Sequence, residues 1–346
     1  MKEKRAPKNR WRKEKKGSKE KSGNLFVRFL RWIFPWKGDT GKTVSLKIVF
    51  LICLVTCIIS GVVLADSYIK DQQADHEYLH AQSLMGNSSA EKPTEDPEEE
   101  DKPKLPLPEG YREEYDALYQ INQQLCGWVK IEGTGIDYPV VHPDDNSYYL
   151  NHTFYGSYNS SGVPYLDYRC RSAGGALSTN SIIYGHNLNS GRMFHDIVHY
   201  KDVSYYKSHP VIEFNTVYAD SSWKIIGMFF ANADMSLEDA FPYHMFLEKE
   251  TDEQFYDVLN NAMQRSFFTT GVDVNADDKL LMLSTCDNAF GDSRLVLLAR
   301  QVRSGESAAV DTSSAKQNAS QYLPQNYIDK FGGEYREWDK DYRFYS

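Results

Sequence analysis

The sequence predicts a mainly β protein: a closed barrel of about eight strands, held outside a membrane by one N-terminal helix. Three observations lead to this prediction. A long apolar run follows a basic N-terminus, short β-like runs separated by Gly, Asn, Asp and Pro fill the middle of the chain, and one amphipathic helical segment interrupts them. With 41% hydrophobic and 25% charged residues, the composition is that of a globular protein.

Residues 1–43 form a basic tail that we expect in the cytoplasm. The chain has a net charge of −9, yet this tail carries a large excess of Lys and Arg. Within it, residues 25–36 mix aromatic side chains with Arg28 and Arg31, a pattern typical of a helix lying on anionic lipid. A nucleic-acid partner is disfavoured, because an apolar span follows the tail directly.

The transmembrane anchor is placed at residues 44–66. Its apolar part, VSLKIVFLICLVTCIISGVVL, is uninterrupted from Ile48 and long enough to cross a bilayer as a helix. A run that is apolar on every side, with basic residues at one end only, fits a membrane span better than a buried core helix. Because positive charge stays inside, everything from Asp66 onward is expected outside the cell, on a single-pass protein. A cleaved signal peptide is the alternative, and the long basic tail favours a retained anchor.

Residues 67–110 are predicted to form a polar helix, over 67–84, and then an extended acidic linker rich in Pro and Glu. The folded domain is placed at residues 111–303 and opens with a helical segment, YREEYDALYQINQQL, ahead of the β-like runs. These runs are Gly127–Ile131, Tyr138–Val141, Val163–Asp167, Ser181–Tyr184, Val211–Phe214, Trp223–Phe230, Lys279–Thr285 and Arg294–Val302.

An amphipathic helix is predicted over residues 251–267, between the sixth and seventh β-like runs. Phe255, Val258, Leu259 and Met263 recur at helical spacing, and Asp252 suits the first turn. We therefore expect this inserted helix to pack on the barrel.

The C-terminal extension, residues 304–346, begins rich in Ser and Ala and ends rich in aromatic residues interleaved with charge. Three roles stay open for it: docking on the domain, binding cell-wall material, or remaining disordered. The sequence does not separate them.

The chain has five cysteines, of which Cys53 and Cys57 lie in the predicted span and Cys126, Cys170 and Cys286 lie outside it. An odd number outside leaves at least one unpaired thiol, and whether Cys126 and Cys170 pair stays open. In an oxidising compartment an unpaired thiol is either buried and inert or retained for its reactivity.

The segment 279–302, KLLMLSTCDNAFGDSRLVLLARQV, predicts a β-hairpin of two apolar strands joined by a polar loop. Cys286 ends the first strand and Arg294 starts the second, so hairpin topology alone places them at the same mouth of the sheet. An arginine beside a cysteine lowers the thiol pKa and donates to an oxyanion, which a thiol acyl-transfer site needs besides a base. His186 is the candidate base, because it closes the run SIIYGHN where a strand meets a turn. Taken singly, each of the three is more often structural.

From about residue 122 to residue 302 the chain resembles the class B sortases, cysteine transpeptidases of Gram-positive bacteria. The segments GWVKIEGTGIDYPVV, DNSYYL, SGVPYLDYR, IIYGHN, MFHDIVHYKD and LSTC, with the Arg that follows, look like those of the family in order and spacing. The resemblance covers the whole predicted barrel and its inserted helix, and does not cover the C-terminal extension. It implies that His186, Cys286 and Arg294 are the catalytic residues.

The resemblance also implies a reaction and its partners. The Cys286 thiolate would attack the carbonyl after Thr in a sorting-signal pentapeptide, giving a thioacyl-enzyme that an amine resolves. His186 would protonate the leaving amine and later accept a proton from the incoming one, while Arg294 would stabilise the oxyanion. The partners would be surface proteins with a C-terminal sorting signal and an amine of peptidoglycan or of a pilin, with no metal or organic cofactor. The signal motif and the amine stay open.

The resemblance implies further residues that bind the substrate. These are Asn146 and Leu150 in DNSYYL, and Ser284, Thr285 and Asp287 around the cysteine, with Thr285 acting through its backbone or hydroxyl. The loop over residues 231–245 is expected to form another wall of the groove.

Other functions fit the sequence less well. An L,D-transpeptidase-like site usually has Arg almost directly after its cysteine, and a papain-like site usually has its cysteine ahead of its histidine. His195 and His199 share a helix face as metal ligands do, but no third ligand is evident. A non-catalytic, membrane-tethered binding or scaffold protein on the same barrel remains the alternative, against which the intact His186, Cys286 and Arg294 argue.

Overall fold

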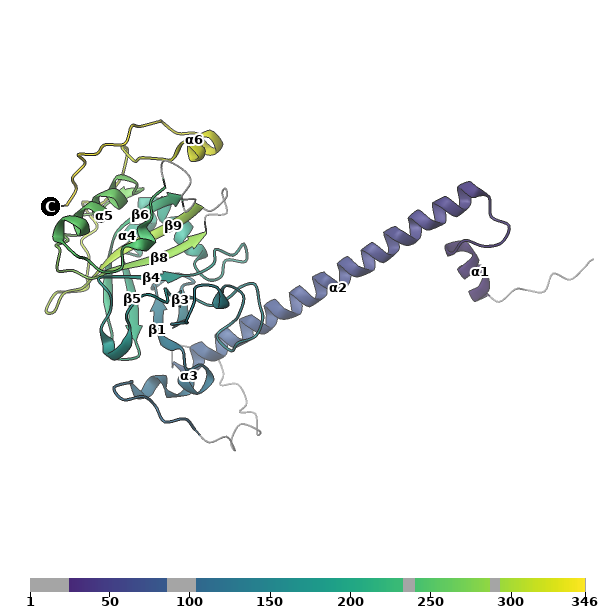
Figure 1. The fold of residues 1–346 in the computed structure, drawn as a ribbon, viewed down its shortest axis with the longest axis horizontal. Helices are drawn as coiled ribbons and strands as arrows, with labels where there is room; N and C mark the ends of the chain where they lie inside the picture. The colour runs from purple at the N-terminus through teal and green to yellow at the C-terminus, as the bar shows by residue number, and fades with distance from the viewer. Residues whose placement is uncertain (1–24, 86–103, 233–239, 287–292, 346) are drawn as a thin grey trace, which may run out of the picture. The chain divides into compact units, whose positions relative to one another are not determined.

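The computed structural model describes residues 25–85, 104–232, 240–286 and 293–345 and divides the chain into two units, residues 1–69 and 70–346 (Figure 1). The first unit is helical. α1 (Leu25–Ile33) confirms the helix expected over residues 25–36, and a short turn joins it to α2 (Gly41–Leu84). Lys47 ties the two helices together, because its Nζ donates to Arg31 O at 2.6 Å and to Asp39 Oδ2 at 2.7 Å.

By length and composition, α2 can cross a membrane, and none of its most apolar stretch is buried. The predicted anchor and the predicted polar helix after it form this one continuous helix, because neither Asp66 nor Ser67 interrupts helical geometry. The part of α2 that belongs to the second unit has a buried stripe of Ala74, Tyr78 and Ala81, whose spacing places them on one helix face.

The second unit is a closed barrel of eight strands in the order β1-β2-β3-β4-β8-β9-β6-β5. Each of the eight predicted runs supplies one barrel strand, so the predicted fold class is confirmed. The β2–β3 and β4–β8 pairs are parallel, and the other barrel pairs are antiparallel. The strands are β1 (Leu125–Lys130), β2 (Asp137–Val141), β3 (Tyr165–Leu166), β4 (Asn180–Tyr184), β5 (Val211–Thr216), β6 (Ser222–Asn232), β8 (Leu280–Cys286) and β9 (Ser293–Gln301).

α5 (Asp252–Gln264) is the predicted inserted helix. Thr251 caps its N-terminus by accepting a hydrogen bond from Gln254 N at 3.1 Å. Its buried residues Phe255 and Leu259 share one core cluster with one face of β8, to which Leu280 and Met282 belong.

The other face of β8 contributes Leu281 and Leu283 to the second core cluster, which fills the barrel. This alternation is that of a strand covered on both sides. The segment expected to be helical from Tyr111 is shorter than predicted, because β1 begins at Leu125. The remaining helices are η1 (Glu113–Tyr115), α3 (Asp116–Ile121), η2 (Tyr148–Leu150), η3 (Ala173–Gly175), η4 (His195–Lys201), α4 (Val203–Ser208), η5 (Tyr243–Met245) and α6 (Gln325–Phe331).

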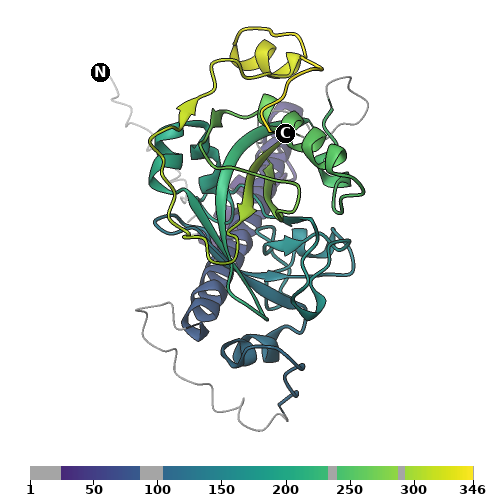
Figure 2. The same ribbon diagram turned by 90° about the vertical axis from the view of Figure 1, so that its left-hand side faces the viewer.

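The C-terminal extension docks on the domain, which is one of the three roles that the sequence left open. Its strand β10 (Lys316–Gln317) pairs with β7 (Phe268–Thr269) in a small separate sheet. Near its end, Tyr345 Oη donates to Val272 O at 3.0 Å. Figures 1 and 2 both show this yellow segment beside α5. β7 and β10 were not predicted: residues 268–269 fall just after the predicted inserted helix, and residues 316–317 fall in the Ser/Ala-rich part of the extension.

Candidate active site

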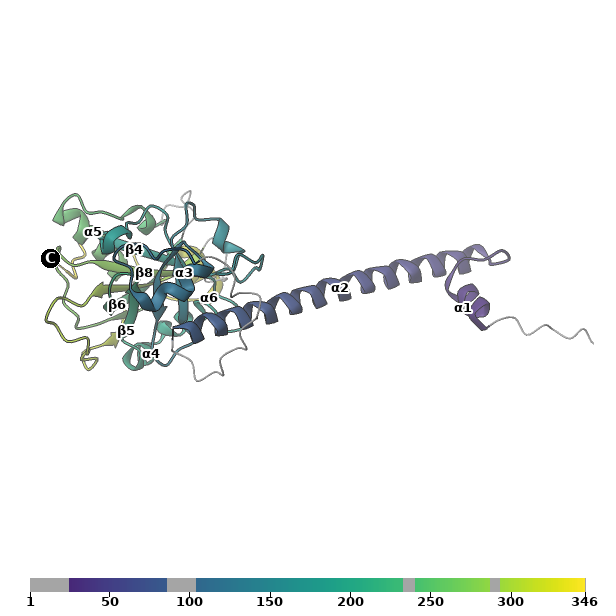
Figure 3. The ribbon, with the colours of Figure 1, turned by 90° about the horizontal axis from the view of Figure 1, so that it is seen from below.

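The ends of β4 and β8 and the start of β9 lie side by side at one rim of the barrel, with β8 in the middle (Figure 1). Figure 3 shows β4 and β8 from below. Across the antiparallel β8–β9 pair, Cys286 is the register partner of Arg294. On the other side of β8, the parallel strand β4 places Tyr184 opposite Ser284. His186 follows Tyr184 by the same interval as Cys286 follows Ser284. His186 therefore lies two residues beyond the end of β4, on the side of β8 that is opposite Arg294.

The hairpin geometry predicted for Cys286 and Arg294 is confirmed in the backbone. β8 and β9 pair without interruption from Leu280 opposite Arg300 to Cys286 opposite Arg294. Residues 287–292, which include the predicted groove residue Asp287, lie outside the part of the chain that the structure describes.

The backbone around His186 is held by two neighbours. Gly185 N donates to Ser284 O at 3.1 Å, which carries the β4–β8 pairing beyond the end of β4. Phe194 N donates to His186 O at 2.8 Å. Gly185 is required here, because a Cβ at this position would lie 2.6 Å from the ring of Phe194. The Gly-His pair in the sequence thus reflects a tight turn that fixes the histidine.

The His186 ring is partly exposed, and its Nε2 lies 2.7 Å from Leu150 O. A carbonyl oxygen only accepts hydrogen bonds, so Nε2 carries the hydrogen. Nδ1 is then the ring nitrogen that can accept or give a proton in a reaction.

Arg294 lies on the same face of β9 as Val296 and Leu298, which belong to the cluster under α5. Its side chain is partly exposed. Among the described residues it has one hydrogen bond, from Nη1 to Ser293 O at 3.1 Å. Within the described part of the chain, most of its donors therefore have no partner and are available to an anionic ligand.

The four other predicted substrate-binding residues that the structure describes differ in exposure. Leu150 is 42% exposed beside His186, so it can meet a ligand. Asn146 donates to Asp167 Oδ2 and accepts from Tyr168 N, both at 3.1 Å, so its amide braces the loop that carries Leu150.

Ser284 and Thr285 are both buried. Ser284 Oγ is bonded to Tyr243 Oη at 2.7 Å and is not open to solvent. Thr285 pairs with Leu295, which belongs to the barrel-filling cluster, so its side chain lies on the opposite face from Ser284. Of the two modes expected for Thr285, this geometry disfavours the hydroxyl and leaves the backbone.

A buried carboxylate that the sequence analysis did not single out lies behind Asn146. Asp167 accepts hydrogen bonds from Arg169 Nη2 at 2.7 Å and from Tyr184 Oη at 3.1 Å. Burial raises the pKa of Asp167, but the hydrogen bonds and charge of Arg169 outweigh it and hold the pKa below its ordinary value. The Asp-Tyr-Arg run after a buried strand was the available signal, since a fully buried carboxylate requires a cationic partner.

The two other cysteines of the second unit, Cys126 and Cys170, are free and buried. Burial raises the pKa of both thiols, that of Cys170 to about 12. Neither has the properties of a nucleophile. One ring nitrogen of each histidine considered as a metal ligand has another neighbour: His195 Nδ1 lies 2.8 Å from an oxygen of Asn187, and His199 Nε2 lies 3.8 Å from Asp196.

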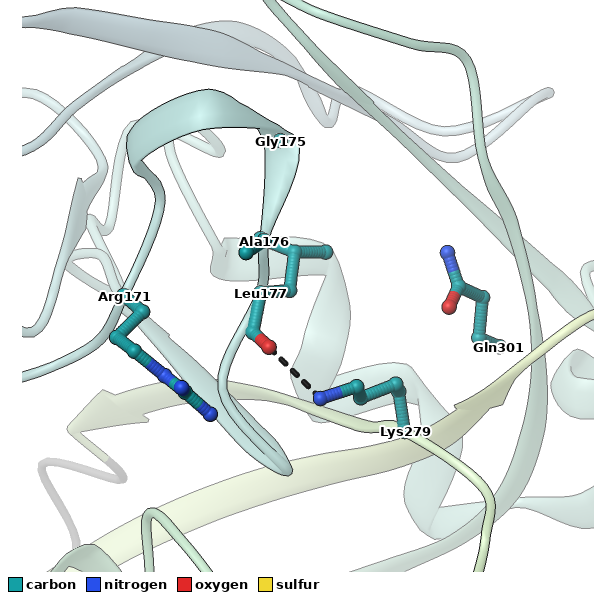
Figure 4. Close-up of a pocket in the computed structure, with 6 residues that line it drawn as sticks. All are labelled: Arg171, Gly175, Ala176, Leu177, Lys279 and Gln301. Atoms are coloured by element: carbon teal, nitrogen blue, oxygen red, sulfur yellow. Dashed lines mark hydrogen bonds between the residues drawn. The ribbon is translucent and has the colours of Figure 1, made fainter.

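A cavity of about 350 Å³ lies at the other end of the β8–β9 hairpin, away from Cys286. Figure 4 shows its lining, in which Lys279 precedes β8 and Gln301 ends β9. Lys279 Nζ donates across it to Leu177 O at 2.8 Å. The cavity therefore does not belong to the cluster formed by the three strand ends.

Comparisons with known proteins agree with this geometry. Residues 129–302 match the Sortase domain family. Sortase B of Staphylococcus aureus is 27% identical over 262 residues, which cover 75% of this chain and 97% of the relative. Sortase B of Listeria monocytogenes is 31% identical over 193 residues, which cover 55% of this chain and 75% of the relative. The crystal structure of the S. aureus protein has 27% sequence identity and a TM-score of 0.51, covering 56% of this chain and 88% of that one.

Proposed function

Since the chain belongs to the sortase family, as a class B sortase and cysteine transpeptidase, we propose that Cys286, His186 and Arg294 cleave a sorting signal and transfer its acyl part to an amine. The observation that carries this proposal is the meeting of the ends of β4, β8 and β9, which brings the three residue types of a thiol acyl-transfer site to one edge.

In the first half of the reaction, the Cys286 thiolate attacks the carbonyl carbon of the Thr in the signal. A C–S bond forms and the carbonyl oxygen becomes an oxyanion, which the open donors of Arg294 stabilise. Protonated His186 gives its proton to the leaving amine, the C–N bond breaks, and a thioester remains on Cys286. Because Leu150 O holds the Nε2 hydrogen, Nδ1 is the nitrogen that exchanges this proton.

In the second half, an amine attacks the thioester and loses a proton to neutral His186. The C–S bond breaks, an amide forms, and the enzyme regains its thiolate and its imidazolium. No metal or organic cofactor takes part in either half.

The substrate lies, in this proposal, between the Leu150 segment and the segment that carries Tyr243. Leu150 contacts the peptide, Asn146 supports the Leu150 loop, and Ser284 and Thr285 support the floor beside Cys286. Asp287 adjoins Cys286 in the sequence and completes the proposed set.

The proposed setting is the outer surface of a Gram-positive membrane. α2 supplies a single-pass anchor with the basic residues 1–43 in the cytoplasm, and the domain at 111–303 is extracellular. The partners are surface proteins with C-terminal sorting signals and an amine of peptidoglycan or of a pilin, together with membrane lipid around the anchor.

The test is an acyl-transfer assay on the full chain in detergent. Peptides of the Leu-Pro-x-Thr-Gly and Asn-Pro-x-Thr-x kinds are incubated with several amines, and the transfer product is identified by mass spectrometry. We expect product with the wild type and none with Cys286→Ala. Cys170→Ala is the matched control, because Cys170 is a buried thiol, and it should retain activity. Equal activity of Cys286→Ala and the wild type would contradict the proposal.

A further inference from the structure

The C-terminal extension lies outside the residues that match the Sortase domain, and two of its aromatic residues enclose an arginine of the inserted helix. Arg265, at the C-terminal cap of α5, is 4% exposed. Its guanidinium carbon lies 4.2 Å from the ring centroid of Trp338, 5.1 Å from that of Tyr322 and 5.1 Å from that of Phe241. We call these four residues the Arg265 cluster. A guanidinium held between aromatic faces in a buried site is a strong cation–π arrangement.

Three hydrogen bonds to backbone carbonyl oxygens hold the extension at this place on α5. Tyr322 N donates to Gln264 O at 2.9 Å, and Gln321 Nε2 donates to Arg265 O at 2.8 Å. From the other side, Gln264 Nε2 donates to Asp339 O at 2.9 Å. Tyr322 and Trp338 therefore reach Arg265 from two separate points of the extension. The rings of Tyr322 and Trp338 also meet edge to face at 5.1 Å.

Phe241, the third aromatic residue of the Arg265 cluster, connects the cluster to β8, the strand that ends at Cys286. Phe241 belongs to the segment 241–246, which includes η5 and lies over the outer face of β8. Its ring packs against Phe229 at 5.4 Å and lies 6.3 Å from Tyr243. Tyr243 Oη is bonded to Ser284 Oγ at 2.7 Å, and Ser284 is followed by Thr285 and then Cys286. Consecutive contacts thus run from Trp338 through Arg265, Phe241 and Tyr243 to β8.

A second contact reaches the strand beside Arg294. Tyr327 on α6 packs against Phe230 of β6 with ring centroids 5.3 Å apart. Phe230 is fully buried, and the next residue, Ala231, is the register partner of Arg294. The extension therefore reaches the segment 241–246 through Arg265 and contacts β6 directly through Tyr327.

We propose that the C-terminal extension positions the peptide-binding wall of this enzyme, with Trp338 and Arg265 as positioning residues that act through Phe241. The role assigned to the segment 241–246 rests on the proposed function. When Trp338 is present, the segment is held in the place that receives the sorting signal. Without it the segment samples other conformations, and the apparent affinity for peptide falls in proportion to the fraction of competent enzyme. The chemical step at Cys286 is unaffected in the enzyme that has bound peptide.

The test compares Trp338→Ala with Trp338→Phe and with Tyr335→Ala, in the full chain in detergent. Tyr335 is the matched control, because it is an aromatic residue of the same extension and is 62% exposed. For Trp338→Ala we expect the KM for peptide to rise about five-fold while kcat changes less than about two-fold. Trp338→Phe should recover most of the KM, and Tyr335→Ala should match the wild type.

Hydrogen exchange of the free enzyme gives a readout that does not depend on activity. In Trp338→Ala the amides of residues 241–246 should exchange faster, while those of β1 and β2 should not change. If Trp338→Ala does not fold, Tyr322→Ala takes its place with the same expectations. A lower Tm with unchanged KM and unchanged exchange at 241–246 would overturn the inference and leave the extension a stabilising strap. If the wild type transfers no acyl group, the proposed function fails, and the exchange measurement still decides whether the extension positions this segment.

Discussion

Strand β9 carries an arginine at each end, and the two ends have opposite surroundings. Arg300 has a side chain that is 1% exposed, and it donates to Glu306 Oε2 at 2.6 Å, Glu306 Oε1 at 2.8 Å and Asp273 Oδ1 at 3.0 Å. Arg294 is partly exposed and donates to Ser293 O at 3.1 Å. A buried arginine with its donors used maintains the fold, whereas one with open donors is available to a developing anion.

The largest expected effect comes from replacing Arg294, the partly exposed arginine of β9. Arg294→Ala should lower kcat/KM for acyl transfer by about 1,000-fold, the cost of losing an oxyanion donor. The Tm should change little, since the side chain makes one hydrogen bond among the described residues. Steady-state kinetics and thermal unfolding of the same preparation measure both. A loss of activity below ten-fold would remove Arg294 from the proposed chemistry.

The second change replaces Arg300, the buried arginine at the other end of β9. Arg300→Ala removes a buried cation and its hydrogen bonds to Glu306, so the free energy of unfolding should fall by about 3 kcal/mol. Lys224 stays paired with Glu306, and Arg303 stays paired with Asp278. The exposed Asp273 contributes little to this loss. Urea titration measures the free energy, and kcat per folded enzyme should remain near that of the wild type. If Arg300→Ala abolished catalysis in folded protein, it would be wrong to assign Arg300 to stability and Arg294 to catalysis.

The third experiment varies the pH to test the ion pair between Arg300 and Glu306. Hydrogen bonds from Arg300 hold the pKa of Glu306 well below its ordinary value of 4.5, against a smaller opposing effect of burial. A lowered carboxyl pKa gives stability that is present above pH 4.5 and is lost as the pH falls from there toward the folded-state value. Glu306→Gln should cost about 2 kcal/mol at neutral pH.

The difference between wild type and Glu306→Gln should narrow as the pH approaches about 3. Urea titrations at neutral pH and at about pH 3 compare the two proteins. A difference that did not depend on pH would show that the charge of Glu306 contributes nothing.

The smallest expected effect concerns the segment 241–246, which packs over β8. Tyr243→Phe removes the hydroxyl that bonds Ser284 and leaves the ring in place, so the free energy of unfolding should fall by about 1 kcal/mol. Tyr205→Phe is a suitable control, because Tyr205 is not part of this wall. A loss equal to that of Arg300→Ala would mean that the segment 241–246 has a larger structural role than the hydrogen bond to Ser284 indicates.

Local sequence patterns predicted most of the fold and brought together two of the three proposed catalytic residues. The eight barrel strands follow from short β-like runs and turn residues, and the proximity of Cys286 to Arg294 follows from the hairpin between them. His186 reaches the same edge through the parallel pairing of β4 with β8, which joins distant segments, so residues alone did not place it there. Its selection required the family resemblance.

Tertiary contacts decided what the sequence left open. The docking of the C-terminal extension depends on the Arg265 cluster, whose members lie far apart in the chain and show no periodic pattern. The burial of Ser284 under Tyr243 likewise depends on what the segment 241–246 packs against. Propensity and periodicity do not report such neighbours.

The most direct test of the account is to locate the acyl group on the enzyme. The full chain in detergent is incubated with a sorting-signal peptide without an amine acceptor, quenched in acid, digested and analysed by mass spectrometry. We predict a thioacyl adduct on Cys286, absent in Cys286→Ala and much reduced in His186→Ala and Arg294→Ala. An adduct on Cys126 or Cys170, or an unmodified Cys286 with a peptide that the enzyme cleaves, would contradict the claim that the ends of β4, β8 and β9 form the active site.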